Sequence, residues 1–228
     1  MTDRLSNGGR TIIFGVEKVE VIMSIKDIRR INIIDVAVKL FLKESMADVK
    51  IKDVAATAGI GEATFYRYFP NRTSLIVACA TYLQETIGQK YFVFDSEKTG
   101  IEMLESFYHR FLEMFNTHPE LYKYLSEFDA YCTRLAHKPL EKYSENFEFF
   151  HDAYIAAYKE GLADGTVREI EDIDIFYYSS THAMLSLCKK LAFEGDIVAQ
   201  DALVDKSKEI KTLGEVFLYY LKKDRVEV

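Results

Sequence analysis

Apolar residues recur at intervals of three and four along most of the chain, which is the spacing of a helix face. Period-two alternation, which is typical of strands, occurs only at residues 11–22. We therefore predict an all-α fold. About nine helices are expected, at 26–45, 51–57, 62–68, 72–90, 99–117, 119–136, 139–163, 171–194 and 206–223, separated by proline- or glycine-containing breaks.

The start of the chain differs from the rest of it. Met23 is followed directly by a natural helix start, so we hypothesise that translation begins at Met23. The alternative is that residues 1–22 form a genuine arm. The predicted organisation is an N-terminal extension (1–23), a small helical domain that we call the head (24–72), and a larger one that we call the body (73–228).

Composition agrees with a globular protein. Of the 228 residues, 49% are hydrophobic and 29% charged, which is enough apolar material for one large core or two small ones. Neither a membrane-spanning stretch nor a signal peptide is recognisable, so we expect a cytoplasmic protein without membrane contact. Cys79, Cys132 and Cys188 lie far apart among apolar neighbours, and we expect reduced, buried thiols.

Charge is distributed unevenly along the chain. The formal net charge is -7, but residues 24–78 carry nine Lys and Arg against six Asp and Glu. Residues 79–228 carry a net charge of -10. A basic head on an acidic body is typical of proteins that bind nucleic acid at one end.

Residues 51–70 have the pattern of a helix-turn-helix. This motif needs a small residue where two short helices touch and a glycine with positive φ in the turn. Ala55 and Gly59 meet these needs. The expected buried positions are Val54, Ala58, Ile60, Phe65 and Tyr68.

The segment from Ile28 to Leu75 closely resembles the N-terminal domain of the TetR family of transcriptional regulators. The resemblance rests on residues 33–41 (IIDVAVKLF), 52–60 (KDVAATAGI) and 63–75 (ATFYRYFPNRTSL). It implies a TetR-like fold, with a three-helix DNA-binding domain before a helical domain for ligand binding and dimerisation. The chain departs from the family at Ser45-Met46, where a glycine and an aromatic are usual, and at Lys50, where the usual cap is Ser or Thr.

The resemblance implies that the second short helix reads DNA in the major groove. Glu62 stands where the family favours lysine, and it either accepts a hydrogen bond from cytosine or merely favours the positive end of the helix dipole. Tyr68 either touches phosphate or packs under the turn as a core aromatic. The predicted DNA-binding residues are Lys50, Gly61, Glu62, Ala63, Thr64, Tyr66, Arg67, Tyr68 and Arg72.

The last two helices are where TetR-like proteins pair into a homodimer, so two-fold symmetry would favour a palindromic operator. Each apolar stripe here is either that interface or plain monomer core. The predicted interface residues are Phe176, Ser180, Met184, Leu187, Leu213, Phe217 and Tyr220.

The middle helices are rich in aromatic residues, and the resemblance implies a pocket there for a small-molecule effector that releases DNA. Core packing is the alternative for each of these residues. The predicted pocket residues are Phe107, Phe111, Phe128, Tyr131, Phe150 and Tyr154.

Catalysis is not expected. The five histidines lack metal-ligand spacing, and neither a phosphate loop nor a nucleophile elbow is present, so we predict no enzyme, metal or cofactor. The function predicted is a DNA-binding regulator, a repressor released by an apolar or aromatic ligand. The alternatives are activation of transcription and a TetR-fold regulator that acts through a protein partner without sequence-specific DNA binding.

Overall fold

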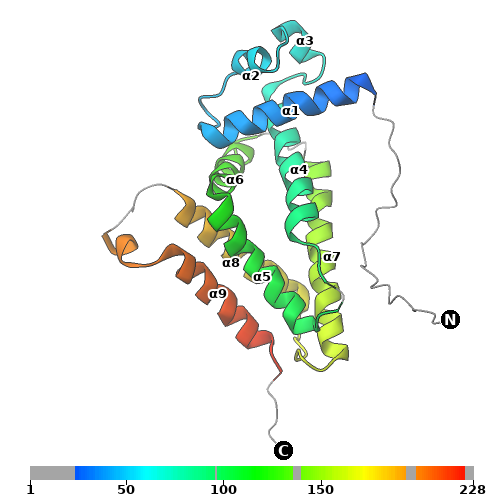
Figure 1. The fold of residues 1–228 in the computed structure, drawn as a ribbon, viewed down its shortest axis with the longest axis vertical. Helices are drawn as coiled ribbons and strands as arrows, with labels where there is room; N and C mark the ends of the chain where they lie inside the picture. The colour runs from blue at the N-terminus through cyan, green and yellow to red at the C-terminus, as the bar shows by residue number, and fades with distance from the viewer. Residues whose placement is uncertain (1–23, 96, 136–139, 194–198, 224–228) are drawn as a thin grey trace, which may run out of the picture.

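The computed structural model describes residues 24–95, 97–135, 140–193 and 199–223 (Figure 1). None of the helices within these ranges is both long and apolar enough to cross a membrane. The elements are α1 (Ile25–Lys43), α2 (Ile51–Thr57), α3 (Glu62–Tyr66), α4 (Arg72–Tyr91), α5 (Gly100–Thr117), α6 (Pro119–Cys132), α7 (Glu141–Ala163), α8 (Ile173–Ala192), the 3-10 helix η1 (Ala199–Leu203) and α9 (Lys206–Leu221).

The all-α prediction is confirmed for the described part of the chain, which contains nine α-helices and no strand. Residues 11–22, the one strand-like stretch, lie outside the described residues, and so does the proposed start at Met23. Several helix ends differ from the predicted ranges by one or two residues, and the end of α6 differs by four. α3 stops at Tyr66 because the chain tightens into a turn in which Tyr68 N–H bonds the carbonyl of Phe65. α6 stops at Cys132, four residues before the predicted end.

The head is formed by α1, α2 and α3. Ser24 caps α1 by accepting a hydrogen bond from Asp27 N at 3.1 Å, and the Asp27 carboxylate accepts one from Ser24 N in return. One face of α1 then packs into the core, because its apolar residues repeat at helical spacing. The buried members of this face are Ile33, Ile34, Ala37, Val38 and Phe41.

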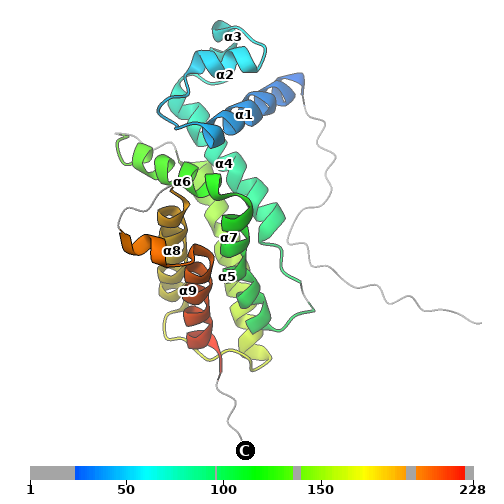
Figure 2. The same cartoon turned by 60° about the vertical axis from the view of Figure 1, so that its left-hand side comes forward.

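α4 links the head to the body (Figures 1 and 2). Asn71 caps this helix, because its Oδ1 accepts a hydrogen bond from Ser74 N at 2.8 Å. Leu75 and Ile76, one turn further on, are fully buried. The head core therefore continues into the body along this helix, and the two regions share one apolar cluster.

α5 is the central helix of the body and packs against α6, α7, α8 and α9. It crosses α7 at very short range: a Cβ atom added at Gly100 would lie 2.0 Å from the backbone nitrogen of Gly161. The crossing is tied by Gly100 N–H, which donates to Asp164 Oδ2 at 2.7 Å. Only glycine at position 100 permits this approach.

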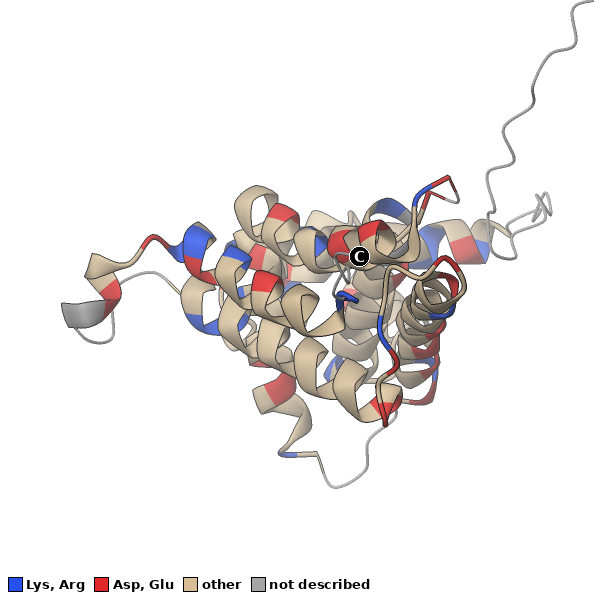
Figure 3. Ribbon diagram, turned by 90° about the horizontal axis from the view of Figure 1, so that it is seen from below, with Lys and Arg blue, Asp and Glu red and all other residues tan. Residues whose placement is uncertain are grey.

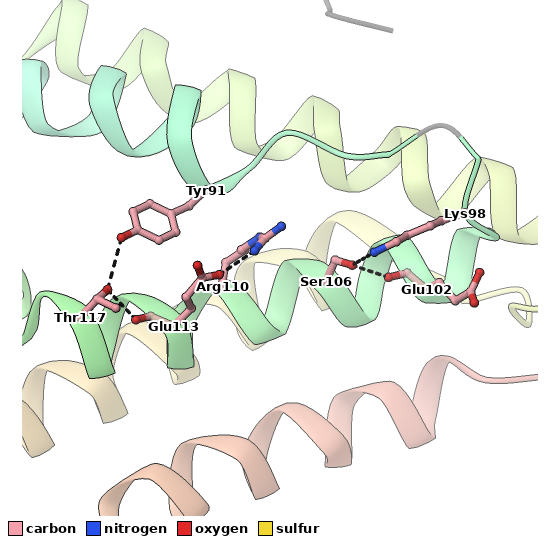
Figure 4. Close-up of polar contacts among 7 residues, drawn as sticks. All are labelled: Tyr91, Lys98, Glu102, Ser106, Arg110, Glu113 and Thr117. Atoms are coloured by element: carbon pink, nitrogen blue, oxygen red, sulfur yellow. Dashed lines mark hydrogen bonds and ion pairs between the residues drawn. The ribbon is translucent and has the colours of Figure 1, made fainter. Parts of the chain in front are cut away.

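The outer face of α5 is polar (Figure 4). Arg110 Nη1 pairs with Glu113 Oε2 at 2.6 Å, and Tyr91 Oη lies 3.2 Å from Thr117 Oγ1. The second contact ties the last residue of α4 to the last turn of α5. The linker that joins these helices also bonds α5, because Lys98 Nζ donates to Ser106 Oγ at 3.3 Å.

Candidate nucleic-acid interface

The turn between α2 and α3 has the predicted geometry. Gly59 adopts φ +68°, in the left-handed region. This lets Ile60 N–H bond back to the carbonyl of Ala55 at 3.0 Å. Val54, Ala55 and Phe65 are buried beneath the turn, whereas Ala58, Ile60 and Tyr68 are half-buried. The two short helices are thus held at a fixed angle by their own packing.

One side of α3 faces solvent at the end of the molecule. Gly61 caps the helix with extended backbone and no side-chain bond, because glycine has no acceptor to offer. Thr64 is half-buried, and Tyr66 is 49% exposed. The exposed members of the predicted set on and around α3 are Gly61, Glu62, Ala63, Tyr66 and Arg67. All five are accessible to solvent, and their contact with DNA stays a prediction.

A basic hollow adjoins the end of α3. It has a volume of about 330 Å³ and is lined by residues of α1 and by the turn after α3. The lining residues are Ile25, Lys26, Arg29, Arg67 and Tyr68. Lys26 and Arg29 are absent from the predicted set, because sequence spacing does not show that the start of α1 lies beside the end of α3.

Of two other predicted DNA contacts, Lys50 leaves its side chain exposed and Arg72 has a role inside the protein. Lys50 is exposed before α2, and its N–H donates to Asp53 Oδ2 at 3.1 Å. Arg72 is half-buried and donates to the carbonyl of Val49 at 2.7 Å and to that of Met46. Arg72 therefore braces the loop between α1 and α2. A phosphate contact by Arg72 stays a prediction, and it competes with these two bonds.

The same loop is held from the body. Glu127 of α6 accepts hydrogen bonds from Met46 N–H and from Ser45 Oγ, the latter at 3.2 Å. Met46 is 4% exposed, so its N–H has little access to water. Glu127 is absent from the sequence-based predictions, and no local signal marks it, because its partners lie about eighty residues earlier in the chain.

α6 makes further bonds at this junction. Tyr131 Oη lies 2.7 Å from Thr73 Oγ1, and Tyr124 Oη donates to the carbonyl of Ile76 at 3.0 Å. At its other side α6 is joined to α8 by the Lys189–Asp129 ion pair. α6 thus connects the body to the loop between α1 and α2 and to the first turns of α4.

The predicted pocket residues fall into two groups. Phe107 contacts both Phe111 and Tyr154. Phe92 contacts Phe107 and Phe111 and joins them to Phe150, with a centroid distance of 5.0 Å between Phe92 and Phe150. These rings form the aromatic cluster of the body. Phe128 and Tyr131 lie elsewhere on α6: Phe128 contacts Tyr143, and Tyr131 reaches the head–body junction. The structure therefore brings together four of the six residues.

A chain of buried hydroxyl groups borders the aromatic cluster. Tyr108 Oη donates to Ser180 Oγ at 2.8 Å and lies 3.0 Å from Tyr154 Oη, while Ser180 Oγ donates to the carbonyl of Tyr177. Burial raises the pKa of Tyr108 to about 12, because a phenolate would be poorly solvated there. The cluster is thus apolar with a line of neutral hydrogen-bonding groups at its edge.

The predicted dimer face needs correction. Ser180 and Met184 are fully buried inside the protomer, so they are not available to a partner. Apolar residues surround much of α8, and periodicity alone did not tell which side faces the core. Leu187, Leu213, Phe217 and Phe176 are half-buried, whereas Tyr220 is 49% exposed. The exposed apolar residues of α8 and α9 are Ile175, Tyr178, Val216, Tyr219 and Tyr220.

Comparison with known proteins agrees with this geometry. Residues 33–79 match the family model described as bacterial regulatory proteins, tetR family. The matched range contains most of α1, the whole helix-turn-helix and the start of α4. The N-terminal part of the chain is therefore similar to the N-terminal domain of TetR-family regulators. Together with the all-helical fold, this match indicates a TetR-family transcriptional regulator. No curated protein matches the sequence.

Several solved structures share the TetR-type fold over nearly the whole chain. A TetR-family regulator from Mesorhizobium loti has a TM-score of 0.64 at 14% identity, covering 88% of this chain and 100% of its own. One from Haloarcula marismortui has a TM-score of 0.63 at 18% identity, covering 85% and 98%. The ketosteroid regulator KstR2 of Mycobacterium tuberculosis has a TM-score of 0.57 at 16% identity, covering 86% and 96%. At such identities the likeness concerns the fold.

Proposed function

We propose that this chain is a DNA-binding transcriptional repressor that leaves a palindromic operator when a small apolar or aromatic ligand binds the body. The observation that carries the proposal is the exposed surface of α3, presented at the end of the molecule by the Gly59 turn. A short helix presented in this way fits the major groove of B-DNA. Such a protein acts where the chromosome is, so we place it in the cytoplasm.

In this proposal the exposed side of α3 reads bases. Glu62 is positioned in the first turn to accept a hydrogen bond from cytosine, and Tyr66 and Thr64 offer hydroxyl groups to base edges or phosphates. Arg67, at the end of α3, serves as a phosphate or guanine contact. The half-buried Tyr68 is at once a packing residue and a lining residue of the basic hollow.

We propose a homodimer that pairs through the exposed sides of α8 and α9. Val216, Tyr219 and Tyr220 follow one another at helical spacing on α9, and Ile175 and Tyr178 do so on α8. Exposed apolar side chains gathered in this way mark an interaction surface. Val216→Glu/Tyr219→Glu should give a monomer by light scattering, and Leu162→Glu on α7 should not. A wild-type monomer would contradict the dimer.

The aromatic cluster of the body is the proposed effector site. Its rings offer apolar contact, and the hydroxyl chain of Tyr108, Tyr154 and Ser180 offers hydrogen bonds at the edge. The chain contains no tryptophan, so Phe150→Trp would introduce a single reporter in the cluster. We expect the aromatic probe 1-anilinonaphthalene-8-sulfonate to change the emission of this tryptophan but not that of Tyr219→Trp. No change at position 150 would argue against the site.

The test of DNA binding is fluorescence anisotropy with the intergenic DNA upstream of the protein's own gene and a random duplex of equal length. We expect nanomolar, selective binding to the upstream DNA. Glu62→Ala/Tyr66→Ala should reduce selectivity, because these side chains face the bases in the proposal, whereas Glu97→Ala in the body should not. If neither this DNA nor a genome-wide search yields a selective site, the alternative is favoured: a regulator that acts through a protein partner.

A further inference from the structure

We propose that Lys26 and Arg29 of α1, together with Arg67 and Tyr68, form a binding site for a phosphate of the DNA backbone beside the groove that α3 enters. This inference rests on the proposed function and adds a second helix to its DNA contact. α1 is the longest element of the head, and its first turns would then grip the DNA backbone while α3 reads base edges.

The geometry begins with the hollow between α1 and the end of α3. Lys26 and Arg29 are three residues apart, so they project from the same side of α1. Arg67 and Tyr68 close the hollow from the turn after α3. Its volume of about 330 Å³ leaves room for a phosphate group with neighbouring sugar atoms. It is continuous with the exposed surface of α3, because Arg67 belongs to both.

The charges in the hollow are unbalanced. Among the described residues, no hydrogen bond or ion pair engages the side chains of Lys26, Arg29 or Arg67. The nearby acid, Asp27, is directed elsewhere: its carboxylate bonds Ser24 Oγ at 2.6 Å. These bonds, with weaker attraction from Lys26 and Arg30, lower the pKa of Asp27. Three cations that share one hollow without an acid on its wall favour an anion.

The lack of a partner within the head is not shared by every cation of α1. Arg30, one residue after Arg29, lies over the Phe69 ring at 4.9 Å from its centroid and so has a partner within the head. Among the described residues, Arg29 and Lys26, which line the hollow, have no such partner. The DNA backbone fits better than a single carboxylate, because it presents successive phosphates to the three cations grouped beside the end of α3.

The experiment compares Lys26→Ala/Arg29→Ala with Lys43→Ala, a matched control at the opposite, C-terminal end of α1 that is also exposed. Anisotropy is measured on the upstream DNA and on a random duplex, at several salt concentrations. Because phosphate contacts carry no sequence information, we expect the double variant to bind both DNAs more weakly by the same factor, about tenfold or more. The dependence of log K on log salt should also become shallower, by about 0.9 for each phosphate that the variant no longer neutralises.

Each outcome decides the inference. Equal affinities and salt slopes for the double variant, Lys43→Ala and wild type would overturn it. A weakening confined to the upstream DNA would also overturn it, because that pattern belongs to base reading. Uniform weakening by the double variant supports the phosphate site, whether or not wild type prefers the upstream DNA. A lack of preference in wild type counts against the proposed function alone. Failure of wild type to bind either DNA at low salt overturns both. Circular dichroism confirms that the variants fold.

Discussion

The cations at the outer end of the head differ in their contacts from many of those in the body. In the body, Arg110 pairs with Glu113, Lys142 with Glu85 and Lys190 with Asp201. Seen from the body end, acidic and basic residues lie side by side on its helices (Figure 3). At the outer end of the head, Lys26, Arg29 and Arg67 share a hollow without an acid on its wall.

This contrast matters for binding more than for stability. Exposed ion pairs contribute about 0–1 kcal/mol each, so the paired cations of the body stabilise the fold only slightly. Unpaired cations at one end instead create a local positive potential on a chain of net charge -7. Net charge alone would have pointed away from nucleic acid.

The largest expected effect is a loss of stability in the body that does not involve the turn of the head. Gly100→Ala forces a Cβ into the backbone of Gly161, so α5 and α7 must separate. We expect the free energy of unfolding to fall by about 3 kcal/mol in urea denaturation. Gly61→Ala is the matched control, because nothing lies within 4 Å of a Cβ there. Equal unfolding free energies for Gly100→Ala and Gly61→Ala would refute the close crossing of α5 and α7.

Alkaline pH should also destabilise the body. The pKa of Tyr108 is raised from 10.0 to about 12 in the folded state, so the unfolded chain loses this proton first. The stability that this proton contributes is fully present below pH 10 and is lost as pH rises to 12, a decrease of about 3 kcal/mol. Tyr108→Phe should make the decline of the unfolding free energy shallower over this range, whereas Tyr219→Phe, at an 83% exposed site, should not. Identical pH profiles of the unfolding free energy for wild type and Tyr108→Phe would contradict the raised pKa of Tyr108.

The junction between the two regions depends on Glu127. Glu127→Ala removes the acceptor of the buried Met46 N–H, at a cost of about 1–3 kcal/mol. We expect faster hydrogen exchange in residues 44–50, whereas Glu120→Ala on the same helix should leave that loop unchanged. Gln at position 127 keeps an acceptor and should restore part of the protection. Unchanged exchange in Glu127→Ala would show that the body does not hold the loop.

The smallest expected effect concerns the start of α3. Gly61→Ser would supply the side-chain acceptor that this cap lacks, and we expect a gain of a few tenths of a kcal/mol in the free energy of unfolding. Thermal denaturation of Gly61→Ser beside Gly61→Ala separates the hydroxyl from the added Cβ. A Ser variant no more stable than Ala would mean that the cap geometry differs from the one described.

The helix-turn-helix was predictable because its determinants are local. The range 51–57 for α2, the Gly59 turn and the Asn71 cap all depend on residues within a few positions of one another. The body was predictable only as a set of helices. Periodicity did not separate the buried side of α8, with Ser180 and Met184, from its exposed side.

The parts of the candidate site that were not predicted are those that depend on tertiary placement. Lys26 and Arg29 become candidates only when α1 is seen beside the end of α3, and Glu127 only when α6 meets the loop before α2. Neither contact leaves a sequence pattern, because the partners are separated by some forty and eighty residues. Their proposed roles in DNA binding and in head–body coupling come from the three-dimensional arrangement.

The most direct test of the central claim, that the head alone carries the DNA-binding surface, is hydrogen exchange of the full chain with and without the upstream DNA. We predict that DNA slows exchange at residues 61–68 and in the first turns of α1, and leaves the outer faces of α7 and α9 unchanged. Protection confined to the body, or none in the head under conditions where anisotropy shows binding, would contradict the claim.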